Sequence, residues 1–278
     1  MTQLSLPYWH VDAFADRIFA GNQAAVIPLE EWLPDAVLTA IAAENMFAET
    51  AFLLPDASGA ADYELRWFTP TVEVAMCGHA TLASGHVLLS QEGVGSAVGD
   101  TITFRTRQAG VLSVARAEEG YELVLPTTPV APRDDPALLA SLGTQGAVFR
   151  STGGAEDVAI VLLEDEAAVR ALAPDMRALA ATELLAICTA PGARTDVVSR
   201  VFAPAWGIDE DPVTGSAHAA LAPFWAERLG RATFTAHQAS ARGGDLTCRL
   251  ASDSEGRERT VLTGRCITVV EGRFFLEI

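Results

Sequence analysis

The stretch RWFTP at positions 66–70 returns as RVFAP at positions 200–204, and this repeat decides the expected fold. Each copy has the pattern R-x-F-x-P. Each is followed by a glycine that opens an Ala-rich helical stretch, GHATLA from Gly78 and GSAHAA from Gly215. Motifs that recur in the same order about half a chain apart indicate an internal duplication, although an Ala-rich chain also produces chance matches. The repeat predicts two similar domains that face each other.

Two further pairs of motifs extend the repeat upstream. Pro34-Asp35 and Pro174-Asp175 each open a helical stretch, and turns at Gly21 and at Gly153-Gly154 each lead into a short apolar strand. The chain has 278 residues, which is near the length at which single hydrophobic cores split into two. Length and repeat therefore agree on two domains.

Hydrophobic patterning predicts an α+β fold of largely antiparallel hairpins with one main helix in each half. The expected helices cover 34–44, 78–90 and a stretch from 215 to 229, and the expected strands cover 7–14, 24–29, 50–54, 63–68, 100–104, 110–115, 121–125, 260–270 and 273–278. The proline-rich stretch 126–136 is the expected linker. We expect an N-terminal domain over residues 1–126, which a C-terminal strand could complete, and a C-terminal domain over residues 127–278.

Composition removes several classes of function. The 19 basic side chains include no lysine, so every one of them is arginine. Enzymes that form a Schiff base, including those that anchor pyridoxal phosphate, need a lysine amine, and so does the phosphate clamp of a P-loop. The net charge of −17 argues against a nucleic-acid partner and against adsorption to an anionic membrane. A small molecule is the expected partner.

The four cysteines indicate a reducing compartment. Cys77, Cys188, Cys248 and Cys266 form neither a CxxC pair nor a metal-ligand spacing, so no metal is expected. No apolar run approaches the ~20 residues of a membrane span. Residues 1–10 lack the basic and apolar regions of a signal peptide. We expect a cytoplasmic protein.

Glu49 is the first candidate for chemistry, because it is the only ionisable residue in the otherwise apolar segment 46–54. Burial without a nearby cation raises the pKa of a carboxyl group towards the range that is useful for proton transfer. A glutamate at this position could also cap a turn or point to solvent. The residues alone leave both interpretations open.

Gly78 and Gly215 each open a helix just after a probable strand. The first N–H groups of a helix form an anion site, and glycine lets a ligand approach the backbone closely. Two such helix starts could hold a carboxylate and stabilise an enolate-like oxygen. His79 would then donate a proton or a hydrogen bond, unless it is simply a packed histidine.

Asp211 lies in the acidic loop 209–215 and is held extended by Pro212. It is a candidate to orient a substrate amine or to assist proton transfer, and a solvated acidic group at a helix start is the alternative. Cys77 could be a thiol acid or base, as in racemases that lack pyridoxal phosphate. The second half offers no matching thiol, because Cys188 lies in an apolar stretch typical of a core.

Together these motifs resemble the phenazine-biosynthesis PhzF-like isomerase family. The matching segments occur in the family's order along nearly the whole chain, at 12–26, 49–52, 66–70, 77–81, 211–218 and 238–244. The resemblance implies the diaminopimelate-epimerase-like fold, in which each of two similar halves wraps a barrel-like, mostly antiparallel sheet around a central helix. It also implies an active-site cleft between the halves, a homodimer and no cofactor.

In the family's best-understood activity, a glutamate moves a proton between carbons of trans-2,3-dihydro-3-hydroxyanthranilate. The resemblance gives Glu49 that role, with His79 and Asp211 as the other acid/base and positioning residues. The substrate-binding group that it implies is Gly78, Ala80, Gly215, Ser216 and Cys77. Two positions depart from the pattern. Ala48 stands where members often have serine, and Cys77 matches a thiol of the related racemases but has no partner thiol.

The leading hypothesis is a cofactor-independent isomerase that shifts a proton on a small carboxylate substrate, with Glu49 acting first as base and then as acid. A second hypothesis is an amino-acid racemase or epimerase that uses Cys77 with a carboxylate partner. A third is a non-catalytic relative that binds a small molecule.

Overall fold

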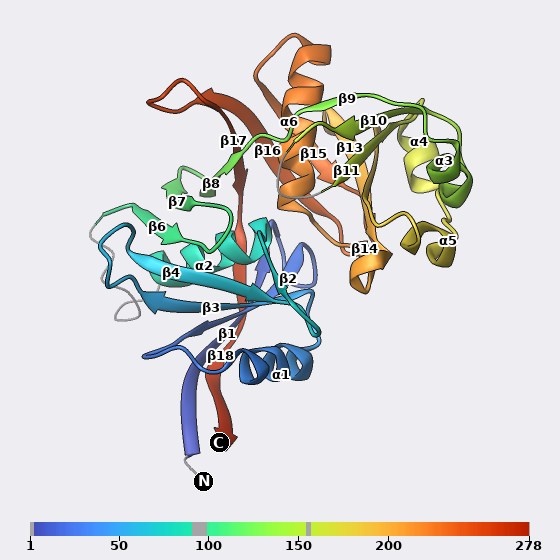
Figure 1. The fold of residues 1–278 in the computed structure, drawn as a ribbon. Coiled ribbons are helices and arrows are strands. Elements are labelled where there is room, and N and C mark those ends of the chain that lie inside the picture. The colour runs from blue at the N-terminus through green and yellow to red at the C-terminus, as the bar shows by residue number, and fades with distance from the viewer. Residues whose placement is uncertain (1–2, 91–98, 154–156, 278) are drawn as a thin grey trace. The chain divides into compact units, whose positions relative to one another are not determined.

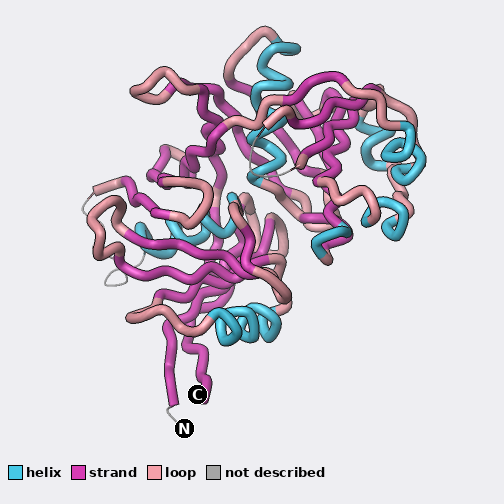
Figure 2. Tube along the Cα trace, viewed as in Figure 1, coloured by secondary structure: helices cyan, strands magenta, loops and turns pink. Residues whose placement is uncertain are grey.

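A computed structural model describes residues 3–90, 99–153 and 157–277, and the chain divides into two compact units (Figure 1). The first unit comprises Met1–Val124 with Thr263–Ile278, and the second comprises Leu125–Leu262. Strands are the predominant regular secondary structure of each unit (Figure 2). The expected turn residue Gly154 and the expected strand residue Ile278 lie outside the described residues. None of the described helices is long and apolar enough to cross a membrane.

The first unit is built from a mostly antiparallel sheet. Its strands are β1 (Gln3–Ala13), β2 (Asn22–Pro28), β3 (Glu49–Pro55), β4 (Tyr63–Phe68), β5 (Glu73–Val74), β6 (Thr101–Arg105), β7 (Val111–Ala117), β8 (Gly120–Pro126) and β18 (Cys266–Glu277). β1 lies between β18 and β2, and pairs antiparallel with both. Only the pairs β2–β3 and β4–β6 are parallel among the pairings described for this unit.

The helix α2 (Gly78–Ser90) is the centre of the first unit. It packs against β1, β2, β3, β6, β7 and β18, and 11 of its 13 residues are buried. Burial on all sides explains why the helix is rich in small residues. A Cβ on Gly85 would lie 2.3 Å from Val114 Cγ1, so the strand β7 can approach only because this position is glycine. A second helix, α1 (Asp35–Asn45), packs on β3 and β4.

The second unit has the same kind of construction. Its strands are β9 (Val130–Pro132), β10 (Ala147–Ser151), β11 (Val158–Leu162), β12 (Leu185–Pro191), β13 (Val197–Ala203), β14 (Ile208–Asp211), β15 (Thr233–Gln238), β16 (Gly244–Ser252) and β17 (Glu258–Gly264). Its helices are α3 (Pro136–Leu142), α4 (Glu166–Arg170), α5 (Met176–Ala180), the short 3-10 helix η1 (Pro204–Trp206) and α6 (Gly215–Leu229). α6 packs against β11 and β16, and 11 of its 15 residues are buried.

The order of strand pairings repeats between the units. In the first unit the pairs β1–β2, β2–β3, β3–β4, β4–β6 and β6–β7 are antiparallel, parallel, antiparallel, parallel and antiparallel. The pairs β10–β11, β11–β12, β12–β13, β13–β15 and β15–β16 follow the same sequence in the second. This repetition of topology confirms the two similar α+β halves that the sequence motifs predicted.

The R-x-F-x-P motif has the same structural role in both units. Arg66 on β4 donates from Nε (2.8 Å) and Nη2 (2.7 Å) to the carboxylate of Glu73 on β5. Arg200 on β13 donates from Nε (2.7 Å) and Nη2 (2.9 Å) to the carboxylate of Glu210 on β14. Each guanidinium also lies over the phenyl ring two residues further along its own strand, 4.9 Å from the centroid for Arg66 and 5.0 Å for Arg200. The motif therefore ties down the short strand that precedes each central helix.

Some expected boundaries were wrong. We expected a break between strands near residues 271–272, whereas β18 runs without interruption from Cys266 to Glu277, and the break falls at Arg265. A glycine such as Gly272 weakens a strand, but continuous pairing of β18 with β1 outweighs that local preference. The expected linker at 126–136 contains β9, which pairs with β10.

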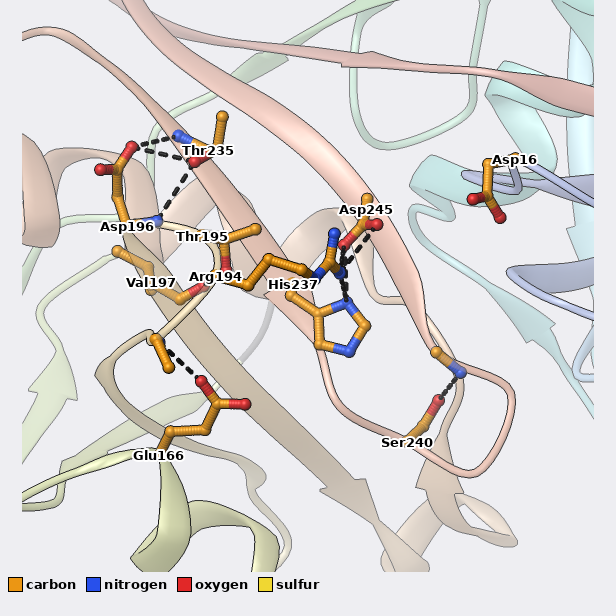
Figure 3. Close-up of polar contacts among 12 residues, drawn as sticks. Asp16, Glu166, Arg194, Thr195, Asp196, Val197, Thr235, His237, Ser240 and Asp245 are labelled. Atoms are coloured by element: carbon orange, nitrogen blue, oxygen red, sulfur yellow. Dashed lines mark hydrogen bonds and ion pairs between the residues drawn. The ribbon is translucent and has the colours of Figure 1, made fainter.

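A polar network joins the β15–β16 hairpin to the turn before β13 (Figure 3). Arg194 donates from Nη2 to both carboxylate oxygens of Asp245 (2.8 and 3.0 Å), and His237 Nδ1 lies 2.6 Å from the same carboxylate. Asp196 accepts from the backbone N–H of Thr235 (2.8 Å). The Arg194 side chain is 68% exposed, so this ion pair contributes little to stability and serves mainly to orient the turn.

Each central helix also carries a histidine within its length, partly buried in α2 and fully buried in α6. His86 on α2 contacts Tyr121 Oη (3.0 Å) and Thr268 Oγ1 (2.8 Å), in agreement with the packing role that its spacing from His79 indicates. His218 on α6 contacts the carbonyl oxygen of Thr214 (2.7 Å) through Nδ1. Burial lowers the pKa of each ring from 6.5 to about 4. Both rings are therefore neutral in the folded chain near pH 7.

Replacing Arg66 with methionine tests the importance of the strand anchor. Arg66 is 3% exposed, and its loss removes the bidentate partner of Glu73, which then keeps the exposed Arg107 as its cation. We expect the free energy of unfolding to fall by about 3 kcal/mol in urea denaturation. The matched control is Arg17→Met, because the Arg17 side chain is 72% exposed, and its effect should stay within about 0.5 kcal/mol. Equal stability of the two variants would contradict the anchor.

The buried His218 predicts an acid-dependent loss of stability. Its pKa is lower in the folded chain than in the unfolded chain, so the unfolded chain takes up the proton first as the pH falls. Stability is complete above about pH 6.5 and is lost as the pH falls towards 4. His218→Gln cannot titrate and should lose about 1–2 kcal/mol less than wild type between pH 7 and pH 5. Urea unfolding at both pH values measures this, and an identical pH dependence would contradict it.

Candidate functional site

Glu49 begins β3, at the end of a tight reversal of the chain. α1 ends at Asn45, and Met46 adopts a left-handed conformation (φ 55°) that closes the helix. Asn45 Nδ2 then donates to Thr50 Oγ1 (3.0 Å), which holds the turn in place. The Glu49 side chain is 13% exposed, so it does not simply point to solvent. β3 pairs parallel with β2, which places Glu49 opposite Ala24.

His79 lies beside Glu49. It is the second residue of α2, its side chain is 4% exposed, and its Nε2 lies 3.3 Å from Glu49 Oε2. Burial lowers the pKa of the ring to about 3, despite a hydrogen bond with the Gln23 main chain that acts in the opposite direction. The ring is therefore neutral near pH 7. A neutral imidazole has one donor and one acceptor nitrogen, and Nδ1 accepts when Asn22 Nδ2 is the donor.

Asn22, at the start of β2, contacts the other nitrogen of the His79 ring. Its Nδ2 lies 3.1 Å from His79 Nδ1, across 57 positions of sequence. Asn22 is 1% exposed, so its amide is fixed against the ring. Asn22 lies in one of the motifs that carry the family resemblance, but the sequence predicts no role for it. Its only signal was the Gly-Asn turn, which does not identify the residue that the amide contacts.

Cys77 and the helix start lie beside His79. The Cys77 Sγ is 3.5 Å from His79 Nδ1 and 4.0 Å from Nε2, and the residue is 5% exposed. The Cys77 carbonyl accepts from the backbone N–H of Thr81 (3.1 Å), which closes the first turn of α2. Gly78 and Ala80 are buried in that turn, where backbone N–H groups have no partner within the helix. These groups are available in principle to an anion.

The second unit carries the other predicted residues. Asp211 ends β14, is 7% exposed, and accepts from Thr214 Oγ1 (2.5 Å). Gln238 donates from Nε2 to the Asp211 carbonyl (2.6 Å), while its Oε1 accepts from the Thr214 N–H (2.8 Å). Asp211 is thus a buried, hydrogen-bonded carboxyl group and not a solvated cap. Gly215 and Ser216 are buried in the first turn of α6.

The structure thus forms two groups from the predicted residues. Glu49, Cys77 and His79 come together in the first unit with Gly78 and Ala80. Asp211 belongs to the second unit with Gly215 and Ser216. The sequence analysis assigned no individual role to Gln238, whose side chain bridges Asp211 and Thr214. The only sequence feature that pointed to Gln238 is its place in the matching segment 238–244. Motif spacing does not predict its contact with Asp211, which lies 27 positions away.

Comparison with known proteins identifies the family. The family model for phenazine biosynthesis-like proteins (PhzC-PhzF) matches residues 11–272. A Pseudomonas aeruginosa protein named as an uncharacterized isomerase is 44% identical, over 98% of this chain and 100% of its own. The crystal structure of a PhzF-family phenazine biosynthesis protein from Enterococcus faecalis is 41% identical, with a TM-score of 0.85 over 98% of this chain and 100% of that one.

A more distant likeness concerns the fold alone. A hydroxyproline epimerase from Agrobacterium vitis superposes with a TM-score of 0.62 at 14% identity, over 99% of this chain and 93% of its own. The diaminopimelate-epimerase-like fold that the motifs predicted is therefore confirmed. Together with the family match, these likenesses show that the chain belongs to the phenazine biosynthesis-like (PhzC-PhzF) family and to its isomerases.

Proposed function

We propose that this protein is a cofactor-independent isomerase that moves a proton on a small carboxylate-bearing substrate, with Glu49 as the acid/base group. The observation that carries this proposal is the contact between the Glu49 carboxylate and the neutral His79 ring, 3.3 Å apart at the start of a buried helix. A general base needs a fixed position and partial shielding from water. Glu49 has both, since it is 13% exposed and the ring of His79 faces it.

The proposed reaction has two proton transfers. Glu49 removes a proton from a substrate carbon, and the electron pair of the broken C–H bond is delocalised into the adjacent unsaturated system. The protonated Glu49, whose proton can exchange with water because the side chain is 13% exposed, then delivers a proton to a second carbon, where a new C–H bond forms. His79 keeps the carboxylate oriented between the two steps. Because the base regenerates itself, the scheme consumes no co-reactant.

The substrate carboxylate is proposed to bind backbone N–H groups at the helix starts. These groups are proposed to be those of Gly78 and Ala80 at the start of α2, and the binding roles of Gly215 and Ser216 in the second unit remain predictions. Helix N-termini carry partial positive charge and favour anions. Asp211 is proposed to hold a cationic or polar substituent of the substrate. Ala48 provides no hydroxyl at the position where relatives often have serine, so we propose a small carboxylate that need not be a phenazine precursor. A homodimer and a cytoplasmic location remain predictions.

Glu49→Gln is the decisive variant for this function. The amide cannot accept the proton, so exchange of substrate carbon-bound hydrogen with deuterated water should fall by about 100- to 10,000-fold. The exchange is followed by NMR or mass spectrometry on a panel of small unsaturated carboxylates. Glu44→Gln is the matched control, because Glu44 is exposed on α1 and its substitution should leave the exchange unchanged. Retention of near-wild-type exchange in Glu49→Gln would refute the assignment.

The two remaining hypotheses predict different results in the same assay. A thiol-dependent racemase loses its exchange in Cys77→Ser and inverts a stereocentre, whereas the Glu49 scheme moves a double bond and keeps much of its rate in that variant. A protein that only binds its ligand gives no exchange in any variant, although ligand binding still shifts its melting temperature.

A further inference from the structure

Glu49, Cys77 and His79 form a cluster of side chains that could bind a metal ion as well as transfer a proton. Each of the three side chains offers one possible metal-ligand atom, and these atoms all lie within 4.8 Å of one another. Among residues 3–90, 99–153 and 157–277, this is the one group of three His, Cys, Asp or Glu side chains that meets this criterion. The proposed reaction uses Glu49 and His79 but leaves Cys77 without a task. A thiol placed against an imidazole and a carboxylate is the donor set of a zinc site.

We propose that Glu49, Cys77 and His79 are a three-ligand binding site for Zn²⁺, and that the bound ion blocks the isomerase. Zn²⁺ accepts sulfur, nitrogen and oxygen ligands together, and sites with three protein ligands leave a fourth position for water. The blocking step rests on the proposed function of Glu49, whereas metal binding does not.

The distances suit this ion. Bonds of about 2.0–2.3 Å at tetrahedral angles separate neighbouring ligand atoms by about 3.3–3.8 Å. His79 Nε2 lies 3.3 Å from Glu49 Oε2 and 4.0 Å from Cys77 Sγ. The oxygen and nitrogen are therefore already at ligand spacing, and the thiol, which lies within 4.8 Å of the other two ligand atoms, has to move towards them for the site to close.

The surroundings can orient the imidazole for the metal. Metal-bound histidines commonly hydrogen-bond through the second ring nitrogen to an amide, carbonyl or carboxylate. His79 Nδ1 faces the Asn22 amide at 3.1 Å, and the main chain of Gln23 also contacts the ring. With its oxygen turned towards the ring, Asn22 would accept from Nδ1–H and leave Nε2 to bind the ion.

Zinc binding would change the protonation of Cys77 and the availability of the Glu49 carboxylate. The Sγ–Zn bond forms as Cys77 releases its thiol proton to water, so one proton leaves for each ion that binds. The Glu49 oxygen donates its lone pair to the metal and can no longer accept a substrate proton. Mg²⁺ should not compete, because it prefers an octahedral shell of oxygen ligands.

Cobalt titration tests the site in the full-length protein after treatment with a chelator. Co²⁺ takes up zinc geometries and gives a thiolate-to-cobalt charge-transfer absorption only when a cysteine is a ligand. We expect this absorption to saturate at one ion per chain and to disappear on addition of Zn²⁺. Cys266→Ser is the matched control, since Cys266 is a partly buried thiol of the first unit outside the cluster, and it should retain the absorption.

Variants of the ligands then measure their contributions. Even substitutions in the outer shell of a metal site cost about 10- to 100-fold in affinity, so Cys77→Ser and His79→Gln should each weaken Zn²⁺ binding by more than about 10-fold. Thermal melting without metal checks that each variant is folded. If Cys77→Ser does not fold, alkylation of Cys77 in the wild-type protein decides the question, because Zn²⁺ and not Mg²⁺ should protect it.

Three results would contradict the zinc site or its effect on the isomerase. Cobalt binding without the charge-transfer absorption, or Cys77 alkylation that saturating Zn²⁺ does not slow, removes the site. Proton exchange that continues at full rate in the zinc-saturated protein removes the blocking step. If the metal binds as expected but no carboxylate undergoes exchange, the site stands and the proposed function fails, so the two failures are distinguishable.

Discussion

The ion pair made by the arginine of each R-x-F-x-P motif organises both units, with Arg66 buried and Arg200 14% exposed. Removing a guanidinium from water is costly, and the cost is offset only when its donors find fixed acceptors. Arg66 finds them in Glu73, and Arg200 finds them in Glu210. The stacked phenylalanine rings shield both contacts. Because the acceptors lie on the short strands before α2 and α6, satisfying the arginine also places the start of each central helix.

The central helices explain why chemistry is possible at their first turns. α2 is buried on all sides by strands, so its side chains must be small and its polar groups must be satisfied within the unit. His79 meets that requirement by contacting Asn22 and Glu49. Burial keeps the ring neutral, and its close approach to Glu49 holds the carboxylate beside it. Packing and the proposed catalysis therefore both require that His79 and Glu49 are held in fixed positions. The start of α2, which packing fixes, also carries the N–H groups that are proposed to bind the substrate carboxylate.

Cys77 shows how one site can support two kinds of chemistry. In the proposed isomerase it is a neighbour of the acid/base pair and not a participant. Its sulfur nevertheless lies within 4.0 Å of both ring nitrogens of His79. A carboxylate beside a neutral imidazole is a catalytic arrangement, and the addition of a thiol makes the three groups a set of metal ligands. Vulnerability to a thiophilic ion is thus a physical consequence of keeping a cysteine at the start of this helix.

The sequence by itself determined the duplication, the α+β class, the two glycine-led helix starts and the absence of lysine chemistry, because repeats, periodicity and composition are local properties. It also singled out Glu49, His79 and Asp211 as candidates. Tertiary structure alone decided which of these residues meet. Asn22 reaches His79 across 57 positions, and β18 returns to pair with the first strand of the chain. Contacts of this kind depend on how strands pair and how the chain folds back. A local pattern of side chains does not identify a partner that lies many positions away in the sequence.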